Sequence, residues 1–240
     1  MQTTQPRPAS APRAGVTAPT ALAVFSGDDV YEDLFTAASA VRSALTEEGF
    51  ATRTALGTAR LDDASEADVV VLYTALGRFT GAQRRRLARA VRGGCGLVAL
   101  HSTTVLAPPR DQPDQRDQPD EADRLLAGLI GSRYLSHGPS PHESRFEVHL
   151  DPRHELTAGI APFEVTHEHY RLATAPGVRV VAWRETPTGP EPLVHVRPYG
   201  NGRVCYLQLG HDMRIWGEPA LRHLLRRAAR WACRPAREGD

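Results

Sequence analysis

The sequence predicts an α/β fold in which a mostly parallel sheet is wound with helices on both faces. Residues 67–75 (ADVVVLYTA) and 95–100 (CGLVAL) are apolar along most of their length, as strands must be when helices cover both of their faces. The first hundred residues alternate such segments with segments of helical period and contain no long hairpin. This alternation favours parallel strands joined by helices.

A strand–loop–helix unit begins the fold and is then repeated. The apolar run ALAVF (21–25) meets a turn at 26–29, and a helical period follows through Val30, Leu34, Ala37, Val41 and Leu45. After the strand at 67–75, Thr80 can cap an arginine-rich helix, and the glycine pair at 93–94 ends it. The segment CGLVAL is then the next buried strand.

The second half of the chain changes to short strands and turns. After a helix over DRLLAGLIG (123–131), we expect an irregular stretch at 133–144 and then strands in RFEVHL, FEVTHEHY, VRVVAWRE, PLVHVRPY and RVCYLQL. Gly200-Asn201-Gly202 between the last two strands is a strong hairpin signal. The last helix, at 218–232, is expected to pack on the sheet through Leu221, Leu224, Leu225, Ala228 and Trp231.

The predicted organisation is one domain at residues 20–234 between a disordered leader (1–19) and a short tail (235–240). The leader is rich in Pro, Ala, Thr and Arg and has no apolar block, so we interpret it as neither a secretory signal nor a membrane span. Residues 107–121 carry the motif RDQPD twice and predict a mobile, solvated loop inserted in the domain. We interpret this loop as a neutral insertion, with a lid over a site as the alternative.

The balance of charge disfavours several classes of partner and of chemistry. With 29 basic and 28 acidic residues the formal net charge is +1, so no overall field attracts nucleic acid or an anionic membrane. A small neutral partner fits better. Every basic residue is an arginine, which excludes Schiff-base chemistry on a lysine and the lysine of a phosphate-binding loop.

The cysteines predict the compartment. Cys95, Cys205 and Cys233 are widely spaced, odd in number and set in apolar stretches, so they resemble reduced core thiols and predict a cytoplasmic protein. The apolar residues of the strands in the second half can either pair two chains into a homo-oligomer or belong to the core.

Polar residues follow several predicted strands directly, where an open parallel sheet binds its ligands. Such groups are expected along one edge of the sheet at 26–29, 73–74, 101–104 and 210–212. A Ser102 nucleophile is disfavoured, because a hydrolase elbow sets its nucleophile between glycines, whereas His101 and Thr103 flank this serine. His101 is better placed as a general acid or base or as a metal ligand, with a buried histidine bonded to backbone as the alternative.

Three further segments present histidines or carboxylates at turns or strand ends: SHGP (His137), THEHY (His167, Glu168, His169) and LGHD (His211, Asp212). If the strand FEVTHEHY continues to its end, His167 and His169 share one face and Glu168 takes the other, so only one of these faces can meet the cleft. Two histidines and a carboxylate could bind Zn²⁺ or another divalent ion, but no short spacing such as HExxH is present. Metal-assisted and metal-free acid–base chemistry both stay open.

Four longer motifs follow one another along the chain: GLVALHSTT, LLAGLIGSRYLSHGP, DPRHELTAGIAPFEVTHEHYRL and VRPYGNGRVCYLQLGHDMRIWGEPALRHLLRRAARWA. Together they resemble the ThuA-like, or trehalose utilisation, family over about residues 21–233. The resemblance implies a class I glutamine amidotransferase-like fold, a flavodoxin-like three-layer sandwich, in which the usual cysteine nucleophile is missing and His101 takes its place. Carried over position by position, it implies a site of His101, Ser102, His137, Glu168, His211 and Asp212.

The resemblance implies work on carbohydrates, in the catabolism of trehalose and related disaccharides, with a sugar or keto-sugar as the small-molecule partner. The leading hypothesis is an enzyme, a hydrolase, lyase or isomerase, in which His101 and His211 exchange protons and Glu168 orients an imidazole or serves as base. The candidate substrate site is completed by Tyr73, Trp216 and Asp28. The alternative is a catalytically silent sugar-binding or scaffold module; a glutamine amidase is disfavoured because the elbow has no cysteine.

Two departures from the family pattern affect this site. The first loop reads SGDDVYED (26–33), where family members commonly carry a glycine-rich stretch followed by a histidine, so Asp28, Asp29 or Tyr31 would take its place. THEHY has a histidine where the family often has an aspartate beside the glutamate, and this leaves the metal question open.

Overall fold

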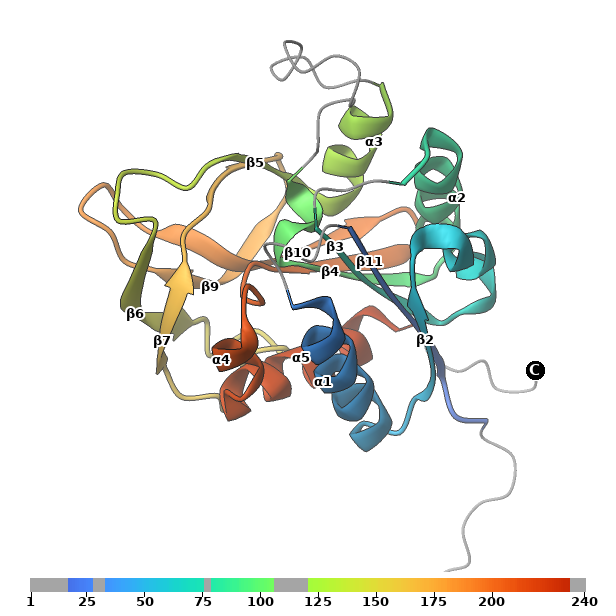
Figure 1. Cartoon of the computed structure of the whole chain (residues 1–240), viewed down its shortest axis with the longest axis horizontal. Coiled ribbons are helices and arrows are strands. Elements are labelled where there is room, and N and C mark those ends of the chain that lie inside the picture. Colours follow the sequence, from blue (N-terminus) through green and yellow to red (C-terminus); the bar gives the residue numbers. More distant parts are fainter. Residues whose placement is uncertain (1–16, 28–32, 76–78, 106–120, 234–240) are drawn as a thin grey trace, which may run out of the picture.

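A nine-stranded sheet runs through the computed structural model of the protein, which describes residues 17–27, 33–75, 79–105 and 121–233 (Figure 1). The strand order is β2-β1-β3-β4-β11-β10-β9-β6-β7. The first five strands in this order are parallel, and the last four continue the sheet in antiparallel pairs. The strands are β1 (Thr20–Gly27), β2 (Ala51–Leu56), β3 (Val69–Ala75), β4 (Gly96–Leu100), β6 (Glu143–Leu150), β7 (Phe163–Glu168), β9 (Arg179–Arg184), β10 (Glu191–Tyr199) and β11 (Gly202–Leu207).

Helices cover both faces of this sheet. They are α1 (Leu34–Glu47), α2 (Gly81–Arg92), α3 (Glu121–Ile130), α4 (Met213–Trp216), α5 (Pro219–Ala232) and the 3₁₀ helices η1 (Thr58–Glu66) and η2 (His101–Thr104). Helices α1 and α5 share one hydrophobic core with the sheet, and η1, α2 and α3 share the other (Figure 1). The mostly parallel sheet between two helical layers confirms the predicted flavodoxin-like sandwich.

Strand β1 explains why the buried strands are apolar at successive positions. Ala21, Ala23 and Phe25 enter the core that contains α1 and α5, whereas Leu22 and Val24 enter the core with η1, α2 and α3. Successive side chains of a strand point to opposite faces, and here both faces are dry. An alternation of apolar with polar residues would therefore leave polar groups buried.

The start and end signals predicted for α2 and the buried face predicted for α5 are confirmed. The Thr80 side chain accepts a hydrogen bond from the backbone N–H of Gln83, whose own side chain returns to Thr80, and Gly93 follows the last residue of α2. In α5 the predicted leucines and Ala228 are buried against the sheet. Trp231 is only partly buried, at the rim of that core. The guanidinium of Arg203 lies over its ring.

Two segments differ from expectation. The stretch at 133–144, expected to be irregular, forms β5 (Ser132–Ser136), which pairs with β8 (Arg171–Thr174) in a separate two-stranded sheet, and the start of β6. The sequence of β5 has no clear apolar alternation, and its partner lies far along the chain, so no local signal marks it. Strand β7 ends at Glu168 rather than continuing to the end of FEVTHEHY.

The predicted hairpin joins β10 and β11, with Tyr199 opposite Gly202. Gly200 has a φ of 61°, in the left-handed region that favours glycine. Gly202 is required for a different reason: a Cβ atom there would lie 2.2 Å from the carbonyl oxygen of Val91 at the end of α2.

Several predictions lie outside the described residues. They concern the leader before residue 17, Asp28 with its neighbours Asp29 and Tyr31, the inserted loop up to residue 120, and residues 234–240. The three cysteines are buried and not joined in disulfides, as predicted. Within the described ranges, no helix is both long enough and apolar enough to cross a membrane.

Replacing Gly202 with Ala is expected to lower the free energy of unfolding by about 1–3 kcal/mol, because the added methyl group forces α2 away from β11. Gly128→Ala in α3 is the matched control. A Cβ atom at Gly128 meets nothing within 4 Å, and alanine favours the helix by roughly 0.8–1 kcal/mol over glycine. Urea unfolding of both variants checks the pair, and an equal effect of the two changes would contradict this account.

Acid is expected to weaken the fold through His195. Burial, with a smaller effect of the Arg197 charge, lowers the pKa of this imidazole to about 3. Between about pH 6.5 and pH 3 the unfolded chain takes up a proton at this position that the folded chain does not, so stability falls as the pH is lowered. Between pH 7 and pH 4.5 the wild-type protein should lose about 1–3 kcal/mol more than His195→Gln in urea unfolding. Equal losses would show that His195 does not carry this dependence.

Candidate functional site

Strand β4 ends in an unusual backbone conformation at His101. This residue begins η2 with a φ of 41°, and it is the one residue other than glycine, within the ranges described, that has a positive φ. Such a conformation costs of order 1–3 kcal/mol, and strain of this kind gathers at functional sites. His101 is completely buried, and its ring stacks on Tyr170 with 4.6 Å between the ring centroids.

The neighbouring strand orients the His101 ring. Leu207 of β11 lies opposite Leu100 of β4, so the next residues of the two parallel strands are also neighbours. His101 Nδ1 lies 2.6 Å from the carbonyl oxygen of Gln208. A carbonyl can only accept, so Nδ1 carries the hydrogen and donates it, and Nε2 points away from the strand.

The other end of that imidazole faces Glu168, the last residue of β7. His101 Nε2 and His211 Nδ1 lie 3.3 and 3.4 Å from Glu168 Oε2, and His137 Nε2 lies 2.6 Å from Oε1. These four side chains are called the Glu168 cluster below. They come from the start of η2, the end of β7, the loop after β11 and the residue after β5, so only the folded chain brings them together.

The Glu168 carboxylate is ionised. Burial of the carboxyl group favours its neutral form, but a hydrogen bond from His101 and the charges of the surrounding imidazoles outweigh burial and lower its pKa to about 2. At neutral pH Glu168 is therefore a fixed negative charge rather than a proton donor.

His167 supports the cluster from behind; the sequence analysis noted this histidine in THEHY but did not include it in the site. Its Nε2 accepts hydrogen bonds from the backbone N–H groups of Gly210 (3.0 Å) and His211 (3.1 Å), and its Nδ1 lies 2.7 Å from the carbonyl oxygen of Glu168. Burial, reinforced by the nearby His101, lowers the pKa of His167 to about 3, so it stays neutral. The expectation that only one face of this strand meets the cleft was wrong: His167 and Glu168 both lie in β7, and both contact the loop after β11. The motif HEH was the available signal.

Two tyrosines that were not predicted line the cluster. The Tyr134 hydroxyl lies 2.6 Å from His137 Nδ1 and can donate to it, so that His137 Nε2 donates to Glu168. The Tyr170 hydroxyl lies 3.0 Å from His101 Nε2. Tyr134 escaped prediction because it belongs to β5, and Tyr170 because it follows the strand whose length was overestimated.

Two predicted substrate residues form a buried wall behind the cluster. Tyr73 donates from its hydroxyl to the carbonyl oxygen of Gly210, and its ring lies 6.3 Å from that of His101 and 6.2 Å from that of Trp216. Tyr73 and Trp216 are both almost fully buried. The Trp216 Nε1 atom is buried, and no hydrogen-bond partner for it lies in the part of the chain that the structure describes.

The remaining predicted residues lie beside the cluster in different roles. Asp212 caps α4 by accepting from the backbone N–H of Arg214, and its carboxylate also pairs with the Arg214 guanidinium. Ser102 is buried, and its hydroxyl has no hydrogen-bond partner among the described residues. Asp28, also predicted for the substrate site, lies outside the described residues.

The Glu168 cluster contains the atoms that could hold a metal ion. His101, Glu168 and His211 each offer one ligand atom, and these three atoms lie within 4.8 Å of one another. Imidazole nitrogen and carboxylate oxygen are ligands that zinc and similar divalent ions accept. The donor set therefore fits such an ion.

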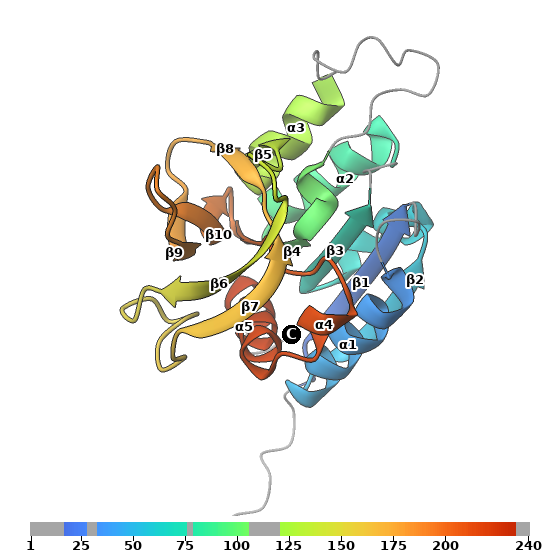
Figure 2. The same cartoon turned by 60° about the vertical axis from the view of Figure 1, so that its left-hand side comes forward.

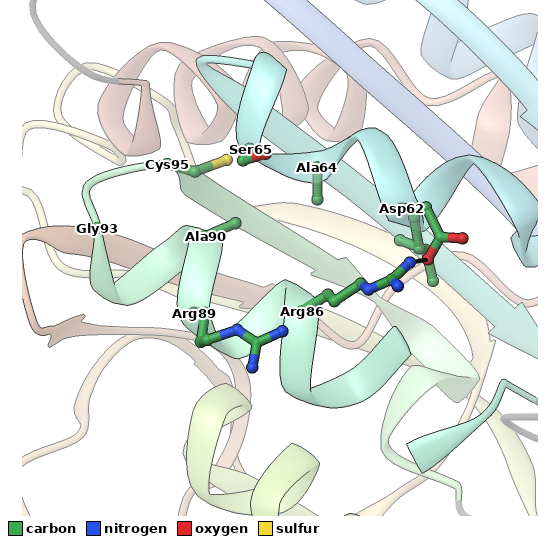
Figure 3. Close-up of a pocket in the computed structure, with 9 residues that line it drawn as sticks. Asp62, Ala64, Ser65, Arg86, Arg89, Ala90, Gly93 and Cys95 are labelled. Carbon is green, nitrogen blue, oxygen red and sulfur yellow. Dashed lines mark ion pairs between the residues drawn. The ribbon is translucent and has the colours of Figure 1, made fainter. Parts of the chain in front are cut away.

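A cavity of about 450 Å³ lies elsewhere, between η1 and α2 (Figure 3). Figure 3 shows the ion pair of Arg86 with Asp62 on one side of the cavity and Cys95 on the opposite side. Cys95 directly precedes β4 whereas His101 directly follows it, so roughly 20 Å of strand separates this cavity from the Glu168 cluster. The cavity and the cluster are separate places in the fold.

Helix α4 and β7 lie side by side next to the cluster (Figure 2). This arrangement of sheet, helices and site can be compared with known proteins. The family model described as "ThuA: Trehalose utilisation" matches residues 21–232, and the chain belongs to this family. No protein of curated function matches the sequence.

Solved structures share the fold at low sequence identity. A ThuA-like protein from Parabacteroides merdae is 17% identical with a TM-score of 0.69, over 89% of this chain and 90% of that one. A ThuA-like protein from Bacteroides uniformis is also 17% identical, with a TM-score of 0.68 over 93% and 95%. A β-galactosidase from Bacillus circulans is 13% identical with a TM-score of 0.63, over 91% of this chain but only 32% of that one.

Ser102 and its neighbour Thr103 are expected to differ in what their hydroxyls contribute to stability. Ser102→Ala should leave the free energy of unfolding unchanged or raise it by up to about 1 kcal/mol, because the buried hydroxyl has no partner within the described ranges to lose. Thr103→Val should lower it by about 1–3 kcal/mol, because Thr103 Oγ1 donates to the Leu72 carbonyl and accepts from the Thr74 N–H. Urea unfolding measures both changes, and a large loss in Ser102→Ala would mean that the hydroxyl is bonded in solution.

Proposed function

We propose that this protein is an enzyme that acts on a sugar or keto-sugar by acid–base chemistry, with His101, Glu168 and His211 as its reaction centre. The observation that carries the proposal is the ionised Glu168 carboxylate with three imidazole nitrogens within 3.4 Å of its oxygens. Titratable groups gathered in this way, at the carboxyl edge of a parallel sheet, are typical of catalytic sites. Membership of the trehalose utilisation family supports a carbohydrate substrate.

The roles within the centre follow from burial and charge. Because Glu168 keeps its negative charge and contacts three imidazoles, we assign it the role of orienting those imidazoles rather than that of a general acid or base. The side chains of His137 and His211 are 35% and 25% exposed, so a substrate can reach them, whereas His101 lies behind them. Imidazole is the side chain best suited to exchange protons near neutral pH, for example at a carbon next to the carbonyl of a keto-sugar.

The surroundings suit an uncharged polyol. Hydroxyls of Tyr134 and Tyr170 and the imidazole of His137 stand beside the carboxylate, and such groups bind sugar hydroxyls through hydrogen bonds. The near-zero net charge of the chain agrees with a neutral substrate. We also propose a cytoplasmic location, which is supported by the three cysteines not joined in disulfides.

A second candidate, a catalytically silent sugar-binding module, is favoured by one observation. His101 is fully buried and bonded to backbone, as a purely structural histidine would be. The two functions differ in whether bound sugar is converted.

Turnover of 3-keto-disaccharides by purified protein separates these functions. The acid–base proposal expects His211→Ala and His101→Ala to lower kcat/KM by about 10²–10⁴-fold. The matched control is His142→Ala, which removes an exposed imidazole next to the cluster and should leave the rate unchanged. Circular dichroism confirms that each variant is folded.

If both cluster variants turn the sugars over at the wild-type rate, the acid–base assignment is wrong. Sugar binding by wild-type protein without any conversion would instead establish the binding module. Glutamine serves as a further substrate in the same assay. Release of ammonia from it would reverse the exclusion of amidase chemistry that the missing cysteine implies.

A further inference from the structure

We propose that His101 Nε2, Glu168 Oε2 and His211 Nδ1 bind one divalent metal ion of the zinc type. The inference rests on the proposed reaction centre and names the cofactor that this centre would take. It is carried by three features: the spacing of the three donor atoms, the direction of the His101 lone pair, and the way in which the remaining atoms of each ligand are already bonded.

The donor spacing matches a metal site. Both nitrogens lie 3.3–3.4 Å from the same carboxylate oxygen. In a tetrahedral zinc site with bonds of about 2.0–2.1 Å, neighbouring ligand atoms are about 3.3–3.4 Å apart. These two distances are longer than ordinary hydrogen bonds, whereas the contact of His137 with the other oxygen is 2.6 Å. Each nitrogen is thus spaced from Oε2 as two ligands of one ion would be, and all three donor atoms lie within 4.8 Å of one another. The pair at Oε1 is spaced as a hydrogen bond.

The His101 ring is held in the tautomer that a metal ligand needs. Its Nδ1–H donates to the carbonyl oxygen of Gln208, so in the neutral ring Nε2 has a lone pair and no hydrogen. Metal-binding histidines are fixed in the same way, by a second hydrogen bond from the opposite nitrogen to a carbonyl or carboxylate. When no ion is bound, a hydrogen on Nε2 lets the ring donate to Glu168, and a bound ion would take the place of that hydrogen. The Tyr170 hydroxyl lies 3.0 Å from the same nitrogen.

The other two ligands are supported as well. His137 takes up Glu168 Oε1, and Tyr134 holds His137 in turn, so Oε2 is left for the ion. The backbone of His211 is held by His167, which accepts the N–H groups of Gly210 and His211. Hydrogen bonds of this kind orient the ligands of known metal sites.

The charge of the cluster also favours a cation. Among the residues that the structure describes, the ion-pair partners of Glu168 are His101, His137 and His211, and none is an arginine. The chain contains no lysine. The negative charge is therefore balanced by protons on imidazoles or by a metal ion in the same place.

A bound divalent ion would polarise a sugar carbonyl or hydroxyl as a Lewis acid. His101 and His211 would then serve as ligands, and His137 would be the imidazole left to exchange a proton with the substrate. Its side chain is reachable from solvent, and its Nε2 stays bonded to the carboxylate oxygen that the ion does not use.

The test measures metal binding directly. The full chain is stripped with a chelator and titrated with ZnCl₂ by calorimetry, and with CoCl₂ while the visible absorption of Co²⁺ is recorded. One ion per chain is expected, with Co²⁺ bands of a nitrogen–oxygen site. Glu168→Gln and His211→Ala should weaken Zn²⁺ binding by at least about tenfold, and His142→Ala should bind as the wild type does. Zn²⁺ should also raise the melting temperature of the wild type and of His142→Ala more than that of Glu168→Gln.

Failure of this inference differs from failure of the proposed function. If the wild-type protein binds no more Zn²⁺ than Glu168→Gln does, the metal site is refuted, even when chelated protein still converts 3-keto-disaccharides. If one ion binds through Glu168 and His211 but no sugar is converted, the metal site stands and the enzymatic proposal fails.

Discussion

The parallel pairing of β4 with β11 is the constraint on which the site depends. Because Leu100 and Leu207 lie opposite each other, the chain leaves both strands at the same edge, and the Gln208 carbonyl meets His101 Nδ1. That one hydrogen bond sets the tautomer and direction of a buried imidazole. Two residues later the same segment reaches Gly210, which accepts from Tyr73, and then His211. A shift of this register by one residue would turn each of these groups to the wrong side.

The antiparallel half of the sheet supplies the charge. Strands β9, β6 and β7 extend the sheet beyond β10, and the far edge strand ends at Glu168 against the loop after β11. The His167 ring joins the end of β7 to the loop after β11, because its Nδ1 bonds the Glu168 carbonyl oxygen and its Nε2 accepts from the Gly210 N–H. The small β5–β8 sheet adds His137 at its end. The parallel half thus provides the fixed imidazole, and the antiparallel half provides the carboxylate that faces it.

Burial makes the site costly as well as specific. His101 has a strained backbone, which lowers stability for the sake of geometry. His167 is kept neutral by burial, which lowers stability only as the pH falls below about 6.5. The two hydrophobic cores on either face of the sheet offset these terms. In such dry surroundings a carboxylate and imidazoles interact more strongly than they would in water. The same surroundings give the cluster its capacity to hold a proton or a metal ion.

Much of the fold could be read from the sequence, because its signals are local. Apolar runs, the Thr80 cap and the glycines of the 200–202 turn each determine a short piece of backbone, and the motifs around His101 and His211 indicated the family. The convergence of His101, Glu168 and His211 was expected from strand ends, but their distances, the support from His167 and the walls of Tyr134 and Tyr170 were not. Those features depend on strand register and on where β7 stops, and both are decided by packing between segments far apart in the chain. The sequence by itself determined which residues can do chemistry, and only the tertiary structure decided which of their atoms meet.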